Sequence, residues 1–300
     1  MKHTIEQIIT EANRIILGKE HQIRLALACL LARGHLLIED LPGMGKTTLS
    51  HLLARLLGMR FQRIQFTSDL LPADILGISV YDRERNHFTF HPGPIFAQFI
   101  LADEVNRATP KTQSALLEAM EEHQVTIEGE TRPLTEPFFV VATQNPDHHI
   151  GTFPLPESQL DRFLMRIEMG YPDSNAERKL LRGANRRDLL QSIQPVTSAS
   201  ELRQMQQQIP DTTVSDALLD YLQALVTFSR EAPQFEHGLS PRAAQSLLRA
   251  AQAWARLEGR DFVIPEDVQS VLPAVAGHRL RGGDPAVSAS DLLLSSVAIP

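Results

Sequence analysis

The stretch that decides the fold is HLLIEDLPGMGKTTLSHLLARLLG, residues 35–58. It opens with a short apolar run typical of a buried strand, continues through a glycine-rich turn, and ends in a segment whose leucines recur at helical spacing. Within the turn, the glycines of PGMGKTT (42–48) let the backbone wrap around an anion with its N–H groups pointing inward. A strand, a glycine-rich loop and a helix in this order predict a phosphate-binding loop.

The residues of this loop are the candidate ligands of ATP. Lys46 is expected to reach the outer phosphates, and the hydroxyl of Thr47 is expected to hold Mg²⁺. The candidate nucleotide-binding residues here are Pro42, Gly43, Met44, Gly45, Lys46, Thr47 and Thr48. The usual pattern G-x-x-x-x-G-K-[ST] would place a glycine at position 40, where this chain has Asp40. This departure lies at the start of the loop, and the residues expected to surround the phosphates, 42–48, keep the usual pattern.

Polar side chains follow two further apolar runs. QFILAD (98–103) ends in Asp103 and is followed by Glu104, and FFVVAT (138–143) leads to Asn145. The carboxyl ends of parallel strands meet at one edge of a sheet, where ligands sit in such folds. Asp103 is therefore a candidate Mg²⁺ ligand through water, and Glu104 is the candidate general base. Asn145 is expected to orient the attacking water or sense the γ-phosphate, although an Asn before Pro is also an ordinary turn residue.

The rest of the chain predicts two domains. Strand-like runs at 61–66 and 163–169 alternate with helical segments, which indicates an α/β core with a mainly parallel sheet between helices, over residues 1–170. Two stretches, 72–94 and 124–134, have the pattern of hairpins, which are either surface decoration or protruding loops that contact a partner. Beyond residue 170 no strand pattern survives, so residues 171–300 are expected to form an all-α domain. Its helices are predicted at 177–182, 200–209, 216–230, 241–258, 266–276 and in the tail.

Composition narrows the class of protein. The chain of 300 residues has 29 Lys and Arg against 36 Asp and Glu, a formal net charge of -7, which argues against a broad basic surface for nucleic acid. The single Cys29 excludes an internal disulfide and fits a reducing compartment. We see no signal peptide and no apolar run of the roughly 18 residues that a transmembrane helix needs, so we expect a cytoplasmic protein.

At this point the residues resemble the MoxR family of AAA+ ATPases. The resemblance covers essentially the whole chain, and its long blocks are more specific than a phosphate loop alone. Position 40 also fits, because this family tends to carry an acidic residue there. The matching stretches are LIEDLPGMGKTTL, FILADEVNRATPKTQSALLEAMEE, ATQNP, LPESQLDRFLMRI and GLSPRAAQSLLRAAQAWARLEGRDFVIPEDV.

The resemblance implies an ATPase core followed by a helical lid, in subunits that form rings, usually hexameric. The nucleotide would sit between core and lid and be completed by a neighbouring subunit. Lys46 and Thr47 match the Walker A positions, Asp103 and Glu104 match Walker B, and Asn145 matches sensor 1. The turn that includes Gly18 resembles the stretch whose backbone contacts adenine. The hairpins at 72–94 and 124–134 resemble the helix-2 and pre-sensor-1 inserts.

Two arginines complete the implied site. Arg162 matches the arginine finger that reaches the γ-phosphate of the next subunit, and Arg242 matches sensor 2. The residues support both roles independently, because Arg162 lies between a helix and a strand, and Arg242 follows the helix-start signature Ser240-Pro241. The alternatives are a surface arginine that pairs with a nearby carboxylate and a solvated helix cation.

The family implies a chaperone-like, ATP-hydrolysing remodeller of partner proteins, commonly paired with a protein that contains a von Willebrand factor A (VWA) domain. One alternative is a DNA-directed motor, which would need basic pore loops; the hairpins carry RER at 83–85 but also EGE at 128–130. A second alternative is a nucleotide-gated binding module with little turnover. The presence of Glu104, Asn145 and Arg162 together disfavours that module.

Overall fold

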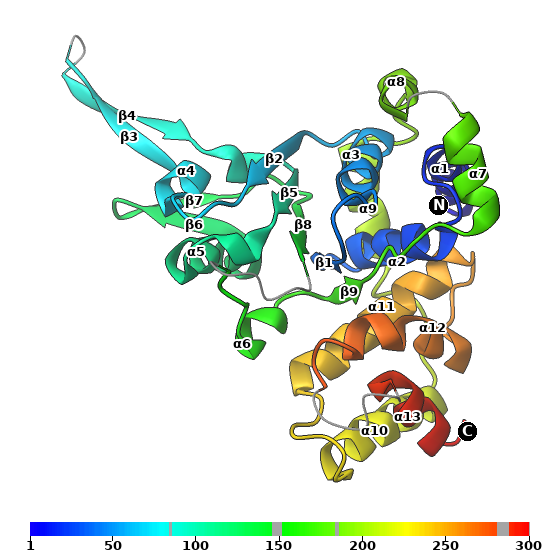
Figure 1. The fold of residues 1–300 in the computed structure, drawn as a ribbon. Helices are drawn as coiled ribbons and strands as arrows, with labels where there is room; N and C mark the ends of the chain where they lie inside the picture. Colours follow the sequence, from blue (N-terminus) through cyan, green and yellow to red (C-terminus); the bar gives the residue numbers. More distant parts are fainter. Residues whose placement is uncertain (84–85, 146–151, 184–185, 281–287, 300) are drawn as a thin grey trace.

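The computed structural model describes residues 1–83, 86–145, 152–183, 186–280 and 288–299, and a parallel sheet forms its centre (Figure 1). The sheet has five strands in the order β2-β5-β8-β1-β9. Neighbouring strands run parallel throughout, which confirms the α/β class predicted from the sequence. The strands are β1 (Leu36–Glu39), β2 (Phe61–Gln65), β5 (Phe99–Asp103), β8 (Phe139–Gln144) and β9 (Met165–Ile167).

The sheet is buried on both faces because its strands are apolar at consecutive positions. Leu36 and Ile38 join one hydrophobic cluster, whereas Leu37, between them, joins another, as the period of two in a strand requires. The first face is covered by α1 (Lys2–Ile15), α2 (Glu20–Leu31) and α3 (Lys46–Leu56). The second face is covered by α5 (Pro110–Glu122). The sheet is therefore the middle of three layers.

Two antiparallel hairpins extend from this core. The strands β3 (Gly77–Asp82) and β4 (His87–Pro92) follow the short α4 (Pro72–Leu76) and form a long arm that reaches away from the other elements (Figure 1). The strands β6 (Gln124–Ile127) and β7 (Glu130–Pro133) form the second hairpin. The guanidinium of Arg132 lies 4.1 Å from the ring centroid of Phe90, so the base of the arm touches the second hairpin. Short 3₁₀ turns lie at Pro94–Phe96 and Val105–Arg107.

Beyond β9, every named element in the described part of the chain is a helix. Helices occur near every position where the sequence predicts one, including the tail, and serine side chains cap several of them; Ser240 Oγ, for example, accepts from the Ala243 N–H at 3.0 Å. The short α6 (Glu157–Leu160) precedes β9. The helices after β9 are α7 (Ser174–Arg182), α8 (Arg186–Ser192), α9 (Ala199–Gln208), α10 (Asp216–Glu231), α11 (Pro241–Leu257), α12 (Pro265–Ala276) and α13 (Ala289–Ser296).

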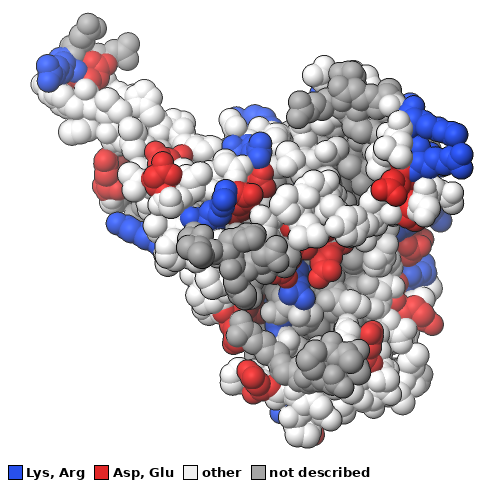
Figure 2. Space-filling view, viewed as in Figure 1, with Lys and Arg blue, Asp and Glu red and all other residues white. Residues whose placement is uncertain are grey.

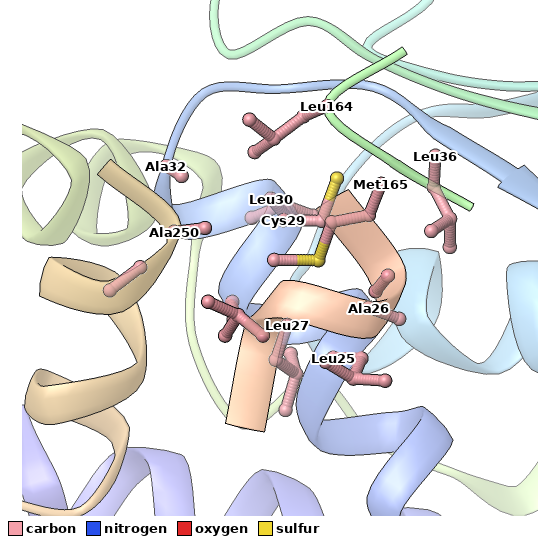
Figure 3. Packing of buried hydrophobic residues seen from close by; sticks show 14 of the residues in the cluster. Leu25, Ala26, Leu27, Cys29, Leu30, Ala32, Leu36, Leu164, Met165 and Ala250 are labelled. Carbon is pink, nitrogen blue, oxygen red and sulfur yellow. The ribbon is translucent and has the colours of Figure 1, made fainter. Parts of the chain in front are cut away.

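Helix α2 joins the two halves of the molecule. It packs against α1 and the sheet, and also against α11, so that eight of its twelve residues are buried. Figure 3 shows Cys29 and Leu30 of this helix beside Leu164, Met165 and Ala250. Burial raises the pKa of the Cys29 thiol, so this cysteine is an inert part of the core. One hydrophobic cluster thus runs from the sheet to the C-terminal helices.

A buried histidine ties together three elements of the core. His35 lies just before β1; its Nδ1 accepts the N–H of Val140 at 3.0 Å, and its Nε2 lies 3.2 Å from the carbonyl oxygen of Met120, near the end of α5. A neutral ring that accepts at Nδ1 must carry its hydrogen on Nε2 and donate it there. Burial lowers the pKa of His35 to about 3, which keeps the ring neutral in this role.

We expect His35 to make the fold acid-sensitive. Its pKa rises from about 3 in the folded chain to the ordinary 6.5 on unfolding, so only the unfolded chain takes up this proton between those values. Stability is therefore lost as pH falls from 6.5 towards 3, by up to about 1.4 kcal/mol per pH unit from this residue. The His35→Gln variant should have a lower free energy of unfolding at pH 7 than the wild type. This free energy should also fall less per pH unit, which urea unfolding at pH 7, 6 and 5 measures. Equal slopes for the two proteins would contradict the assignment.

Candidate active site

The glycine-rich loop has the backbone that the sequence predicts. Gly43 and Gly45 have φ values of 88° and 89°, in the left-handed region that favours glycine. A Cβ at either position would meet no described atom within 4 Å, so the backbone conformation, not lack of space, requires glycine there. Helix α3 begins directly after Gly45 without a side-chain cap among the described residues. Its first N–H groups are therefore available to an anion.

The loop forms one wall of a cavity of about 300 Å³. Residues at the ends of β5 and β8 also line it, so the structure brings together candidate residues from three separate segments. The lining residues are Pro42, Gly43, Gly45, Lys46, Thr47, Thr48, Asp103, Glu104 and Asn145. Two other candidates do not line this cavity with their side chains or Cα atoms. Met44 packs against the core, and Gly18, with a φ of 68°, lies so close to α7 that a Cβ would come within 3.1 Å of Asp173 and Ala176.

Lys46 lines this cavity and is buried. Its Nζ donates to the carbonyl oxygen of Asp40 at 2.5 Å and to Oδ1 of Asn145 at 3.2 Å. Burial lowers the pKa of Lys46, while the carboxylates of Asp40, Asp103 and Glu104 act to raise it. The ammonium group is thus held by oxygen atoms that a phosphate oxygen could replace.

Asp40 explains the departure from the usual glycine pattern. Its Oδ1 accepts the N–H of Leu41 at 2.7 Å, and its Oδ2 accepts the N–H of Gly170 at 2.6 Å. The carboxylate therefore fastens the entrance of the loop to the segment that follows β9. The sequence signal was the acidic residue itself, but its partner lies 130 positions away, beyond the reach of local pattern analysis.

Thr143 organises the two carboxylates at the end of β5. Its hydroxyl donates to Oδ1 of Asp103 at 2.6 Å and accepts the backbone N–H of Glu104 at 2.9 Å. Glu104 has a φ of 59°, which a residue with a side chain adopts only when the surroundings impose it. The guanidinium of Arg63, from β2, donates to the other oxygen of Asp103, with Nε at 3.1 Å.

The carboxylate of Glu104 is held in place by two side chains. Its Oε2 accepts from Nε2 of Gln65 at 3.1 Å and from Nη1 of Arg107 at 2.9 Å. Sequence reasoning missed these contacts, along with those of Arg63 and Thr143. A usable signal was present in FQRIQ (61–65), where polar side chains on one face of a strand alternate with an apolar residue that faces the core.

Arg162 and Arg242 lie together, but away from this cavity. Both pair with Glu121: Arg162 Nη2 lies 3.1 Å from Oε2, and the guanidinium of Arg242 contacts Oε1. They line a second cavity, of about 270 Å³, with Arg33, Arg249 and Arg279. Asp161 forms an ion pair with Arg279, whose Nε lies 2.7 Å from Oδ1 of the aspartate. The position of Arg242 on the lid-side helix α11 thus places it beside Arg162.

The two cavities lie at opposite ends of β1. His35, immediately before this strand, lines the arginine cavity, whereas Pro42 and Lys46, after it, line the loop cavity. At about 3.3 Å per residue, the five steps from 35 to 40 span about 16 Å. The resemblance implied a nucleotide between the core and the lid of one subunit. In the part of the chain that the structure describes, no residue of α10–α13 lines the loop cavity.

Comparison with known proteins agrees with this geometry. Residues 35–165 match the family described as "ATPase family associated with various cellular activities (AAA)", and residues 227–294 match the AAA lid domain. The chain is 45% identical over 272 residues to the YeaC protein of Bacillus subtilis, covering 91% of this chain and 85% of that protein.

Two further comparisons extend over similar lengths. The chaperone MoxR1 of Mycobacterium tuberculosis is 43% identical over 289 residues, covering 93% of this chain and 76% of that protein. A crystal structure from Cytophaga hutchinsonii, described as a candidate ATPase, has a TM-score of 0.89 and 37% identity, and the match covers 100% of this chain and 96% of that one. The parallel sheet, the phosphate-loop geometry and these matches together place the chain in the MoxR-type AAA+ ATPases.

Proposed function

We propose that this ATPase binds ATP in the loop cavity, with the backbone N–H groups of 43–48 and the ammonium of Lys46 on its phosphates. The observation that carries the proposal is the convergence of the loop with Asp103, Glu104 and Asn145 around one cavity. The donors also fit Mg²⁺, because the hydroxyl of Thr47 and the carboxylate of Asp103 line the same cavity and are the hard oxygen ligands that this ion prefers. Bound Mg²⁺ would neutralise charge on the phosphate oxygens.

The chain's own residues would then carry the hydrolysis. Water attacks the γ-phosphorus, the bond to ADP breaks, and Glu104 accepts the proton that the water loses. Asn145, already within reach of Lys46, orients the water or the phosphate. Gln65 and Arg107 hold the Glu104 carboxylate where β5 ends, so that it faces the cavity and not the solvent at large.

Arg162 and Arg242 are proposed to serve the nucleotide of a neighbouring subunit. Their position at the opposite end of β1 supports this, because a subunit cannot bring both ends of one strand to one phosphate. A ring of identical subunits would place the arginine cavity of one against the loop cavity of the next. The family resemblance suggests a hexamer, with residues 1–170 as ATPase core and 171–300 as lid.

The work done by hydrolysis is proposed to be the remodelling of a partner protein, as the chaperone name of the mycobacterial relative suggests. The β3–β4 arm is the proposed contact, because Tyr81 and Phe88 lie near its tip with 46% and 67% of their surface exposed. Their ring centroids are 5.2 Å apart, which forms an apolar patch suited to a polypeptide. A VWA-domain partner and a cytoplasmic location remain predictions from the resemblance and the composition.

A DNA-directed motor is the second candidate. Figure 2 shows Lys and Arg side chains gathered over α7, where Arg178, Lys179 and Arg182 line an open depression. Elsewhere on that face both charges are mixed, which favours protein over nucleic acid as the partner. Of the basic turn at 83–85, residues 84 and 85 lie outside the described residues. Stimulation of the ATPase rate by DNA, but not by a VWA-domain protein, would favour the motor.

Among the described helices, none has the length and apolarity needed to cross a membrane.

Lys46→Ala should lose tight ATP binding, because it removes the ammonium group that lines the loop cavity. Isothermal titration calorimetry with ATP and Mg²⁺ measures this directly. Lys111→Ala, at an exposed position on α5, is the matched control and should bind like the wild type. Equal affinities for the two variants would overturn the assignment of the cavity.

Glu104→Gln should bind ATP about normally and hydrolyse it slowly, because the amide keeps the shape of the side chain but cannot accept the proton. We expect turnover to fall about 10²- to 10⁴-fold, the usual contribution of a general base. Phosphate release measured at saturating ATP tests this, and it also tests the low-turnover alternative through the wild-type rate. Wild-type turnover in the variant would mean that the base is another residue.

Arg162→Ala should bind ATP but lose roughly 10³- to 10⁵-fold in hydrolysis, the range seen for arginine fingers. Mixed with the Glu104→Gln protein it should regain activity, because some interfaces then pair an intact Glu104 with an intact arginine from the neighbour. Arg14→Ala, an exposed arginine that pairs with Glu11 on α1, is the control and should be fully active. A mixture that stays inactive although mass measurements show mixed rings would refute the role in trans.

A further inference from the structure

Glu121, in the last turn of α5, contacts both arginines of the second cavity at once. Its Oε2 lies 3.1 Å from Nη2 of Arg162, and its Oε1 contacts Nη2 of Arg242. Each oxygen takes one guanidinium, so a single carboxylate sets the spacing of two cations that would otherwise repel each other. Among the described residues, the contacts of each arginine with Glu121 use Nη2, which leaves its other N–H groups to a further anion.

The charges around this cavity suit such an anion. Its lining includes five arginines and two carboxylates, Glu121 and Asp161. Asp161 pairs with Arg279, whose side chain is only 5% exposed, so this carboxylate is already bound to a buried cation. Glu121 is therefore the carboxylate of this lining that pairs with Arg162 and Arg242. The surplus of positive charge fits the terminal phosphate of a nucleoside triphosphate.

Glu121 also lies where three parts of the molecule meet. It belongs to the core helix α5, and Arg242 belongs to α11 in the C-terminal half. The chain leaves α5 through His123, whose φ is 52°, and enters the β6–β7 hairpin, which returns with the Leu134 N–H donating to the His123 carbonyl at 2.9 Å. The His35 clamp on Met120 holds the end of α5 in position. A movement of the hairpin or of α11 would therefore reach the arginines through this carboxylate.

We propose that Glu121 is a positioning residue that orients Arg162 and Arg242, as a pair, towards the terminal phosphate of the ATP in the neighbouring subunit. The proposal rests on the proposed function, because it requires that nucleotide to lie against the arginine cavity. It assigns Glu121 no contact with ATP. Its effect falls on the rate at the neighbour's site and leaves ATP binding in its own subunit unchanged.

The test uses Glu121→Gln in the full-length protein. The amide keeps one acceptor for one arginine but turns its NH₂ group towards the other, so a donor faces a donor. We expect kcat to fall about 10- to 100-fold, the cost of misplacing a catalytic group, with little change in KM for ATP, in calorimetric ATP affinity or in ring mass. Glu118→Gln, exposed one turn earlier on the same helix, should behave like the wild type.

Mixing experiments separate this proposal from the proposed function. Glu121→Gln mixed with Glu104→Gln should regain activity, because the second protein supplies an intact Glu121 and intact arginines to the first protein's catalytic site. If Glu121→Gln on its own keeps the full kcat, the positioning role is wrong. The trans site still stands in that case if Arg162→Ala regains activity when it is mixed with Glu104→Gln. If Glu121→Gln is slow and stays slow when mixed with Glu104→Gln, whereas Arg162→Ala does recover in that mixture, Glu121 acts within its own subunit. That result would overturn the proposal. If neither mixture recovers, the proposed trans function fails first.

Discussion

The parallel direction of all the strands in the sheet gives the molecule two chemically different ends. Every strand leaves the sheet at one edge, and the residues that follow β1, β5 and β8 gather there around the loop cavity. Every strand enters at the other edge, where the residues before β1 and β9 gather around the arginines. Because the two groups of residues are separated by the length of a strand, no side-chain rotation can unite them. The proposed division of one catalytic site between two subunits follows from this separation.

The two ends are nevertheless connected by rigid contacts. The imidazole of His35 joins the start of β1 to β8 and to the last turn of α5, which carries Glu121. At the other end Asp40 joins the loop entrance to Gly170, directly after β9. The strand β1 is thus fixed at both ends by polar contacts, which are buried at His35 and part-buried at Asp40. Such contacts are costly to break away from water. This rigidity suits a protein whose arginines are proposed to act on the nucleotide of a neighbouring subunit.

Much of the loop cavity could be predicted from the sequence because its parts are local. PGMGKTT carries its own backbone requirement, and Asp103, Glu104 and Asn145 follow apolar runs whose parallel direction brings their ends together. The place of Arg242 could not be predicted in this way. It depends on how α11 packs against α2, and helical periodicity says which face of a helix is buried but not which neighbour covers it. Glu121 was hidden for the same reason, since on its own it is an ordinary exposed residue near a helix end.

The central claim is that the catalytic site of this MoxR-type ATPase is complete only between subunits. The most direct measurement is the ATPase rate per subunit across a dilution series at saturating ATP and Mg²⁺, with the mass of the assembly recorded at each concentration. The account predicts that the rate per subunit falls in step with the loss of the assembly and that isolated subunits, although able to bind ATP, hydrolyse it very slowly. A rate per subunit that stays constant after the assembly has dissociated would contradict it.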